Sequence, residues 1–428
     1  MKVAVIGSGI SGLSAAHLLR GSAAVTLFEA DNRFGGHAHT VDLTLDGITH
    51  GVDTGFLVYN ERTYPGLIRL FAELGVRTVK SDMSFSVQVP GAIDGQTLEW
   101  SGTDLAAVFS QKRNLLRPRF WAMLRDLLRF NALATRLVQA DWNDRDQPLG
   151  LFLSENRFGN ELRDWYLLPM VGCIWSSPMS EVLKFPIGPL LRFCHNHGLL
   201  QIANRPQWFT VDGGSRNYVE KIVAGLPNAR RGAAVREVVR EPGRIIVKTD
   251  ASSESFDRLV IATHPDQALN MLANPTAQER ELLGAIRYQD NRAVLHTDAS
   301  LLPSNSRAWA AWNYESAVDS PGDVCVHYLI NKLQPLPWSK PVIVSLNPIR
   351  PVDPKCVVRE FNYAHPILDG AAVRAQTQLQ RLQGLHNTWY CGAWTAFGFH
   401  EDGLVSGQSA AKSLLLRSRM QEAAEASL

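Results

Sequence analysis

The order of apolar and polar positions predicts a βαβ unit at the start of the chain. Lys2–Ile6 is a short apolar run of the kind that forms a buried parallel strand. A glycine-rich turn follows, and the run of Ala and Leu from Ser14 to Leu19 is typical of a helix. Val25–Phe28 supplies a second strand. Strand, glycine turn, helix and strand in this order predict a doubly wound α/β domain.

Beyond this unit the pattern is less regular. From about residue 63 to 206, helical periodicity, many arginines and scattered tryptophans replace the strand–turn pattern. A helix is predicted from Ser215 to about Ala224, and a strand, a glycine loop and a helix from Thr388 to about Leu416. Further strands are predicted at Trp208–Val211, Arg244–Lys248, Leu259–Ala262, Ala293–Leu295, Val324–Leu329 and Val342–Leu346.

Composition sets the broad class. The chain has 428 residues, more than one ordinary core organises, so two domains are expected. The net charge of +2 does not indicate a nucleic-acid partner, and none is predicted. The five cysteines form no CxxC pair, which favours reduced thiols in a cytoplasmic protein. The first strand begins at Lys2, leaving no room for a signal peptide, and no apolar run is long enough to span a bilayer.

The first glycine turn carries a dinucleotide-binding fingerprint. Gly7, Gly9 and Gly12 form GxGxxG between a predicted strand and helix, and Glu29 ends the next strand 22 positions after Gly7. Gly7 allows the tight turn, Gly9 lets the backbone approach a pyrophosphate, and Gly12 lets helix and strand pack closely. The free N–H groups at the helix start favour phosphate. Glu29 is predicted to bind the ribose hydroxyls and to repel the 2′-phosphate of NADP.

Two further segments extend this site. Gly35-Gly36 offers a backbone that can approach the phosphates, and Arg33 is placed to help neutralise them. Asp53-Thr54-Gly55 adds another close-approach glycine. Each segment alone is equally consistent with an ordinary turn, but together they favour a flavin cradle.

The C-terminal end carries a second signature. Gly392-Ala-Trp394 follows a strand, and Glu401-Asp402-Gly403 opens a helix. A helix N-terminus aimed at the flavin N1/C2=O edge stabilises the reduced ring. The alternative is a surface helix with Asp402 as its N-cap. The residues assigned to the cofactor are Gly7, Gly9, Ile10, Ser11, Gly12, Glu29, Ala30, Arg33, Gly35, Gly36, His37, Asp53, Thr54, Gly55, Val235, Gly392, Trp394, Glu401, Asp402, Gly403 and Leu404.

These residues, with Asp212-Gly-Gly214, resemble the flavin amine oxidase superfamily, which includes monoamine oxidases, protoporphyrinogen oxidases and carotenoid desaturases. The segments Gly36–Thr40, Leu295–Asp298, Trp309–Tyr314, His365-Pro366 and Gly398–Gly403 resemble one bacterial branch, flavoproteins associated with fatty-acid methyltransferases of the cyclopropane-synthase type. The resemblance implies FAD, hydride transfer to flavin N5, and for this branch oxidation of a modified acyl chain.

The chain also departs from that superfamily. Many amine oxidases hold a water beside flavin N5 with a lysine, where this sequence has Asn291 and Arg292. Cys391 does not sit where the covalent flavin cysteine of the family would lie, so noncovalent FAD is predicted. His37 stands in place of the usual arginine after the second double glycine.

The predicted fold is α/β, a Rossmann-like FAD-binding domain of the GR2 type with an inserted α+β substrate domain. The FAD-binding domain is assigned to residues 1–62, 207–265 and 384–428, and the substrate domain to residues 63–206 and 266–383.

Three histidines are candidates for a catalytic base or polar anchor: His37, His39 and His400. Glu401 is a further candidate. The alternative for each is a structural role, such as a bond to backbone, to phosphate or to the ribityl chain. The pairs His37/His39 and His195/His197 lack a third and fourth ligand nearby, so no metal is predicted.

The segment 112–136 is basic and amphipathic, with a single acid, Asp126. Such a segment suits an anionic membrane surface, and the alternative is an ordinary helix pair with a solvated basic face. Its cations are Lys112, Arg113, Arg117, Arg119, Arg125, Arg129 and Arg136.

The leading hypothesis is a cytoplasmic FAD oxidoreductase, peripheral on the inner face of the membrane, that desaturates a lipid acyl chain. One rival is an amine, porphyrinogen or carotenoid oxidase. Another is a non-catalytic flavoprotein partner of a lipid methyltransferase. Candidate residues for an acyl tunnel, or simply for the core, are Trp165, Tyr166, Met170, Trp175, Trp309 and Trp312.

Overall fold

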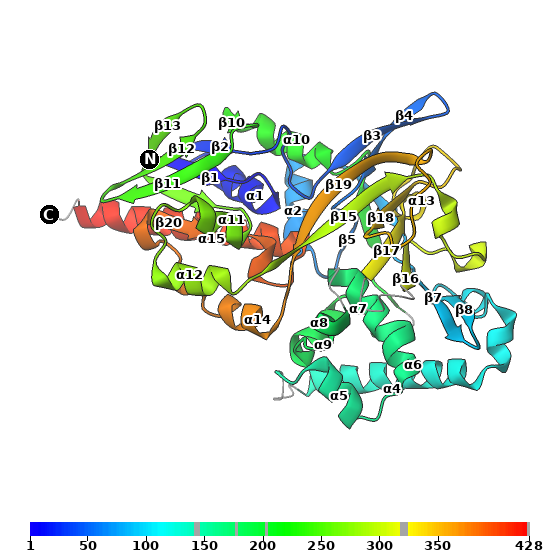
Figure 1. Cartoon of the computed structure of the whole chain (residues 1–428). Coiled ribbons are helices and arrows are strands. Elements are labelled where there is room, and N and C mark those ends of the chain that lie inside the picture. The colour runs from blue at the N-terminus through cyan, green and yellow to red at the C-terminus, as the bar shows by residue number, and fades with distance from the viewer. Residues whose placement is uncertain (141–145, 176–178, 202–203, 317–323, 426–428) are drawn as a thin grey trace.

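A parallel sheet with the predicted fingerprint at its centre organises one lobe of the molecule (Figure 1). The computed structural model describes residues 1–140, 146–175, 179–201, 204–316 and 324–425. The sheet has five strands, all paired in parallel. In spatial order they are β10 (Asn228–Arg230), β2 (Ala24–Phe28), β1 (Lys2–Ile6), β14 (Arg258–Ile261) and β20 (Thr388–Tyr390).

Both faces of this sheet are buried, as a parallel sheet requires. Val3 and Val5 of β1 join one core, and Ala4 and Ile6 join another on the opposite face. The first face is covered by α1 (Ile10–Leu19), α10 (Arg216–Ala224) and α15 (His400–Glu425). The second is covered by an antiparallel sheet of β11 (Val235–Glu241), β12 (Arg244–Thr249) and β13 (Ser253–Phe256), with α11 (Pro265–Met271), α12 (Ala277–Gly284) and α14 (Gly370–Gln376).

A seven-stranded mixed sheet forms the centre of the second lobe. Its long pair β15–β19 reaches back toward the first lobe (Figure 1). In spatial order its strands are β19 (Val357–Pro366), β15 (Tyr288–His296), β18 (Ile343–Leu346), β17 (Val324–Leu329), β16 (Trp312–Ser316), β7 (Phe85–Ile93) and β8 (Gln96–Ser101). Since β7 pairs with β16, this sheet combines strands from both predicted insertions. The domain boundaries themselves stay a prediction.

The helices of the second lobe enclose a separate core that includes Trp165, Met170 and Trp175. Figure 1 shows them below the seven-stranded sheet. They are α3 (Leu105–Val108), α4 (Pro118–Gln139), α5 (Leu149–Glu155), α6 (Asn160–Leu162), a π-helical turn (Arg163–Leu167), α7 (Leu168–Trp175), α8 (Met179–Val182) and α9 (Ile187–Asn196). The predicted helix pair in the segment 112–136 is one 3-10 turn, Lys112–Leu116, followed by α4.

The predicted strands are all present, with one in an unexpected place. β9 (Trp208–Val211) pairs with β5 (Tyr59–Asn60) and β6 (Thr78–Ser81) rather than with the parallel sheet. Within 63–206, where helical periodicity was emphasised and no strand was located, the structure has the strands β6, β7 and β8. Residues 85–89 alternate Phe-Ser-Val-Gln-Val, the period of a strand, and an Asp94-Gly95 turn with positive φ values closes the hairpin.

Two smaller elements complete the molecule. β3 (Thr40–Leu45) and β4 (Ile48–Asp53) form a hairpin, and α2 (Pro65–Leu74) packs beside α15. A short helix, α13 (Ile330–Leu333), connects β17 to the segment before β18. The C-terminal helix α15 continues to Glu425, well past the predicted end near Leu416. In the described parts of the chain, none of the helices combines the length and apolar character needed to cross a bilayer.

Candidate cofactor and active site

The first glycine turn is built as the fingerprint predicts. Gly7 adopts φ +99° and its N–H donates to Phe28 O, which closes the turn between β1 and β2. A Cβ on Gly12 would lie 1.9 Å from Gly7 O, so only glycine lets α1 approach β1. A Cβ on Gly9, in contrast, meets no atom within 4 Å. Gly9 is the N-cap of α1 and provides no side-chain cap, so the helix start is open to an anion.

The loops at 29–37 and 53–55 lie against this turn. Glu29 accepts hydrogen bonds from Ser8 N and Ser8 Oγ, which fixes its carboxylate beside the glycine turn. A Cβ on Gly36 would lie 3.0 Å from Gly9 Cα, and one on Gly55 would lie 2.2 Å from His37 O. A side chain at Gly36 or Gly55 would press on the neighbouring backbone, so both positions require glycine.

The C-terminal signature meets the same turn from the other side. A Cβ on Gly407 would lie 2.0 Å from Ser11 O, and Ser14 Oγ donates to Leu404 O. Because Gly403 and Gly407 have no side chain, α15 packs directly on α1, and the start of α15 lies beside the glycine turn. The alternative, in which Asp402 is the N-cap of a surface helix, does not match the structure. The helix begins at His400, and Asp402 in its first turn accepts a hydrogen bond from Phe399 N instead.

Two predicted cofactor residues are held by other parts of the chain. Glu401 accepts hydrogen bonds from Gly66 N at 2.6 Å and from Leu67 N at 2.8 Å, which caps α2. Trp394 is buried and donates from Nε1 to Thr263 O. Contacts of both residues with the cofactor stay predictions.

The structure shows where the remaining predicted cofactor residues lie, and their contacts with FAD stay predictions. Arg33 donates to Gly36 O, and Ala30 is exposed beside Glu29. Val235 begins β11, across from Thr249. Cys391 is a buried free thiol after β20, and the noncovalent attachment of FAD stays a prediction.

Two of the predicted histidines lie against β19, and the third stacks on Phe56. His37 lies with its ring centroid 5.3 Å from that of His365. His39 Nδ1 lies 2.9 Å from Tyr363 Oη. His400 stacks on Phe56 at 3.8 Å. Tyr363 and His365, both from β19, were not assigned to the site from the sequence, although their i, i+2 spacing in a strand was a usable signal.

These histidines are uncharged. Burial lowers the pKa of His37 well below its usual value and lowers that of His39 to about 4, that of His365 to about 4 and that of His400 to about 3. His37, His365 and His400 nevertheless keep accessible surface.

The nearby acids are engaged by the protein. Asp53 accepts hydrogen bonds from Ser215 N, Ser215 Oγ, Thr40 Oγ1 and Gln334 Nε2. Burial raises the pKa of Asp53 and that of Asp402 to about 6 in each case. With Glu401 capping α2, the carboxylates of this region serve internal structure.

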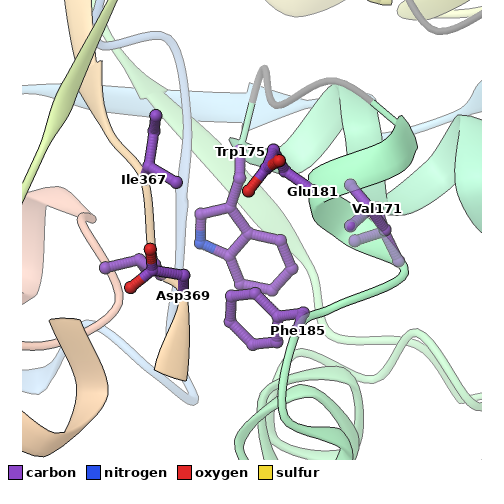
Figure 2. Close-up of a pocket in the computed structure, with 8 residues that line it drawn as sticks. Val171, Trp175, Glu181, Phe185, Ile367 and Asp369 are labelled. Carbon is purple, nitrogen blue, oxygen red and sulfur yellow. The ribbon is translucent and has the colours of Figure 1, made fainter. Parts of the chain in front are cut away.

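An apolar cleft opens on the same region. It lies between α7, α8 and the segment after β19, and its lining combines apolar side chains with the carboxylates of Glu181 and Asp369. Figure 2 shows the rings of Trp175 and Phe185 side by side in it, with Ile367 and Asp369 coming from the opposite wall. Trp175 also packs on Phe193 at 4.7 Å, and Phe193 stacks on Phe399 at 4.9 Å. These aromatic rings lead from the cleft toward the residue beside Phe399, His400.

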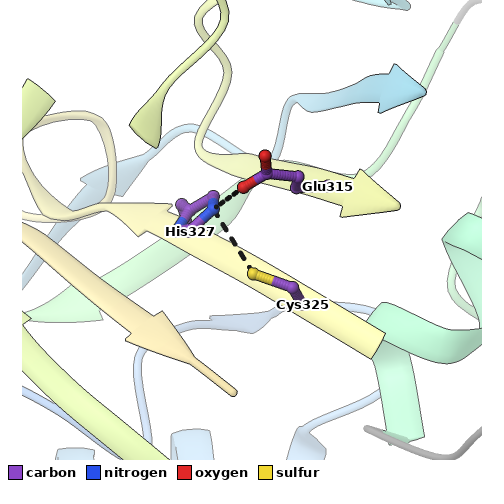
Figure 3. A group of neighbouring side chains, drawn as sticks. All are labelled: Glu315, Cys325 and His327. Atoms are coloured by element: carbon purple, nitrogen blue, oxygen red, sulfur yellow. Dashed lines mark hydrogen bonds and ion pairs between the residues drawn. The ribbon is translucent and has the colours of Figure 1, made fainter. Parts of the chain in front are cut away.

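A second polar cluster lies inside the seven-stranded sheet. Glu315, Cys325 and His327 are buried with their donor atoms within 4.8 Å of one another (Figure 3). Arg350 Nε lies 2.5 Å from Glu315 Oε1 and neutralises the carboxylate, and His327 Nε2 lies 3.0 Å from Glu315 Oε2. Because these partners already use the donor set, the cluster fits a hydrogen-bonded structural group better than a metal centre.

Three features of the glycine site fit a dinucleotide. The space over Gly9 is open, the α1 N-terminus has no side-chain cap, and His37 Nε2 is buried without a hydrogen-bond partner among the described residues. The family of flavin-containing amine oxidoreductases matches residues 10–296. The chain belongs to this family. It is an FAD-dependent oxidoreductase, and the FAD would be held by the glycine turn, Glu29 and the start of α15.

Solved structures agree with this fold across nearly the whole chain. Cyclohexylamine oxidase from Brevibacterium oxydans is similar with a TM-score of 0.68 and 16% identity, covering 98% of this chain and 99% of that chain. Putrescine oxidase bound to putrescine has a TM-score of 0.66 and 15% identity, with 97% and 99% covered. A CLA-producing fatty acid isomerase from P. acnes has a TM-score of 0.67 and 15% identity, with 96% and 97% covered.

Proposed function

We propose that this oxidoreductase dehydrogenates an acyl chain of a membrane lipid. The observation that carries the proposal is the lack of a charged anchor for substrate in the described part of the site. Its histidines are neutral, and its carboxylates, Asp53 and Glu401 among them, are bonded to the protein. The two carboxylates of the adjoining cleft, Glu181 and Asp369, are paired with Lys184 and Arg287. A substrate ammonium would have to displace a protein cation there, whereas an acyl chain needs no charged partner.

The position of Asn291 supports the same conclusion. Its side chain is buried and bonded to His365 and Asn347. The strand β15 therefore has a neutral amide at the position where many amine oxidases of this family have a lysine. One protein of this fold is a fatty acid isomerase and others are amine oxidases, so the fold alone does not choose between the substrates.

The chemistry requires a hydride acceptor and a proton acceptor. FAD supplies the hydride acceptor when bound. Forming a carbon–carbon double bond releases a hydride from one carbon and a proton from its neighbour. Among the predicted histidines, His37 has an unpartnered Nε2, whereas His400 Nε2 is bonded to Tyr218 Oη at 2.7 Å. We therefore assign proton acceptance to His37, with oxygen or another acceptor reoxidising the cofactor.

The apolar cleft supplies the route. Trp175 and Phe185 line its inner wall, and the Phe193–Phe399 stack continues it toward His400. Aliphatic and aromatic walls bind an acyl chain by removing its apolar surface from water. Three of the candidate tunnel residues, Trp165, Met170 and Trp175, belong to the core of this lobe, and of these Trp175 also lines the cleft.

A membrane-facing surface lies on α4 and the turn before it. We define this surface as the exposed residues of 112–129. Leu116 is 88% exposed, and Trp121 and Leu128, seven positions apart on one helix face, are 48% and 52% exposed. The Trp121 ring is held by a hydrogen bond from Nε1 to Leu115 O. Exposed apolar side chains among the arginines of this segment suit insertion at an anionic lipid surface.

Vesicle binding tests this surface. Leu116→Glu is expected to reduce sedimentation with vesicles containing phosphatidylglycerol at least tenfold. Leu416→Glu, at a leucine 63% exposed on α15, is the matched control and is expected to bind as wild type does. Equal binding by both variants and wild type would contradict the assignment of the membrane surface without affecting the proposed reaction.

Anaerobic titration of the FAD-loaded protein tests the reaction. Phospholipids with and without methyl-branched chains are compared with a panel of amines, following the oxidised flavin band. Bleaching by lipid alone is the expected result. Bleaching by amines alone would contradict the acyl-chain reaction and would identify the protein as an amine oxidase. A flavin that dithionite reduces and no lipid does would contradict dehydrogenation and favour a non-catalytic partner of a lipid methyltransferase.

A further inference from the structure

A chain of amide side chains crosses the β18–β15–β19 part of the seven-stranded sheet and ends on His365. Asn347, after β18, is fixed twice to the backbone of Arg292, through its own N–H and through Oδ1. Asn347 Nδ2 donates to Asn291 Oδ1 at 2.8 Å. Asn291 Nδ2 in turn lies 3.1 Å from His365 Nδ1. Each side chain in this chain is therefore oriented by the one before it.

This order determines the tautomer of His365. An amide nitrogen can only donate, so His365 Nδ1 must accept and its proton resides on Nε2. Burial and the neighbouring His264 lower the pKa of His365 to about 4, so the ring is neutral. No hydrogen bond to His365 Nε2 occurs among the described residues, and the side chain keeps accessible surface. His365 thus presents a fixed N–H donor that has no protein partner among the described residues.

The place of this donor follows from β19. Tyr363 and His365 share one face of the strand, and both rings lie against His37, at 5.2 and 5.3 Å. Tyr363 Oη is bonded to Thr54 Oγ1 at 2.7 Å. His37 and Thr54 belong to the two loops that meet the glycine turn. His365 is therefore one side chain away from the cofactor cradle.

We propose that His365 is a cofactor contact that donates from Nε2 to the flavin, and that Asn291 and Asn347 are positioning residues that fix its tautomer. A donor at the flavin ring stabilises the negative charge of the reduced form. Removing it makes reduction less favourable. This inference rests on FAD binding and not on the acyl substrate.

The flavin midpoint potential tests it, measured by photoreduction against a reference dye with no substrate present. His365→Leu is expected to weaken the reduced state relative to the oxidised one at least tenfold, a shift of about 30 mV to more negative potential for a two-electron couple. His365→Gln, which keeps an N–H donor, is expected to recover at least half of that shift. Asn291→Leu, which leaves the ring but frees its tautomer, is expected to move the potential in the same direction.

The matched control is His296→Leu, another histidine of the same sheet, which is bonded to Ser345 at the C-terminal end of β15 and is expected to keep the wild-type potential. A wild-type potential in His365→Leu, or equal shifts in the Leu and Gln variants, would overturn the proposal. If His365→Leu does not retain FAD, Asn291→Leu decides by the same measurement, and a wild-type potential there overturns the proposal. Because no substrate is used, failure here is distinct from failure of the acyl-chain reaction.

Discussion

Replacing Gly9 by alanine separates the cofactor cradle from the fold around it. Gly9 has φ −62° and ψ 174°, a conformation open to alanine, and its Cβ would meet no protein atom within 4 Å. The folded protein without FAD should tolerate the change within about 0.5 kcal/mol. If FAD phosphates approach the α1 N-terminus over Gly9, the same methyl group displaces them.

The magnitude follows from the hydrogen bonds at stake. A hydrogen bond to a charged group contributes about 1.5–3 kcal/mol. Weakening one such bond lowers FAD affinity at least tenfold, since about 1.4 kcal/mol corresponds to a factor of ten. Gly12→Ala is the contrasting variant. Its Cβ would lie 1.9 Å from Gly7 O, so α1 must move and the fold itself should lose about 1–3 kcal/mol.

The assay is urea unfolding followed by tryptophan fluorescence over a series of FAD concentrations. Stabilisation by FAD grows as RT ln(1 + [FAD]/Kd), which yields both the affinity and the stability extrapolated to zero FAD. Gly9→Ala should lower the FAD affinity and preserve the stability without FAD. Wild-type affinity in Gly9→Ala would refute the pyrophosphate site, and a loss of FAD-free stability like that of Gly12→Ala would refute the open space over Gly9.

Three further outcomes are expected from the buried polar groups. Glu315→Gln should cost about 1–3 kcal/mol of unfolding free energy, because it leaves buried His327 and partly exposed Arg350 without their carboxylate. Zinc or a chelator should leave the unfolding midpoint of the wild type unchanged. Burial raises the pKa of Asp53 in the folded protein to about 6. Between about pH 4 and 6 the folded protein therefore binds more protons than the unfolded chain does. The free energy of unfolding falls as pH rises through that window, by up to about 1.4 kcal/mol per pH unit. Asp53→Asn should flatten that slope in urea titrations at pH 4.5, 5.5 and 6.5, and an unchanged slope would assign it to other groups. Glu401→Ala should lower stability by about 1–3 kcal/mol through the lost cap of α2, seen as a lower urea midpoint, and an unchanged midpoint would contradict the capping role.

The local parts of the cofactor site could be predicted from the sequence. The glycine turn and Glu29 depend on neighbours within one βαβ unit, and the pattern of residue types reports that unit directly. The position of the second glycine set, around Gly403 and Gly407, could also be predicted, because it lies on a strand–loop–helix pattern. Its role in packing α15 on α1 was not, since Ser11 and Gly407 are far apart in sequence.

The active-site wall was only partly predictable for the same reason. His37 and His400 were proposed from their loops and stay predictions, whereas Tyr363 and His365 come to lie beside the His37 and His39 loop through β19 and its pairing with β15. No strand was predicted at β19, so the shared face of these two residues was not seen. The strands β6, β7 and β8 were missed because helical periodicity, strongest in the 22-residue α4, dominated the interpretation of that region.

A single-turnover experiment with a deuterated acyl chain tests the central claim most directly. FAD-loaded protein is mixed anaerobically with a phospholipid that carries one perdeuterated chain, and the lipid is recovered for mass spectrometry. The account predicts a product that has lost two deuterium atoms from adjacent carbons, formed in proportion to reduced flavin. Reduced flavin with an unaltered acyl chain, or an intact lipid beside an oxidised flavin that dithionite still reduces, would contradict it.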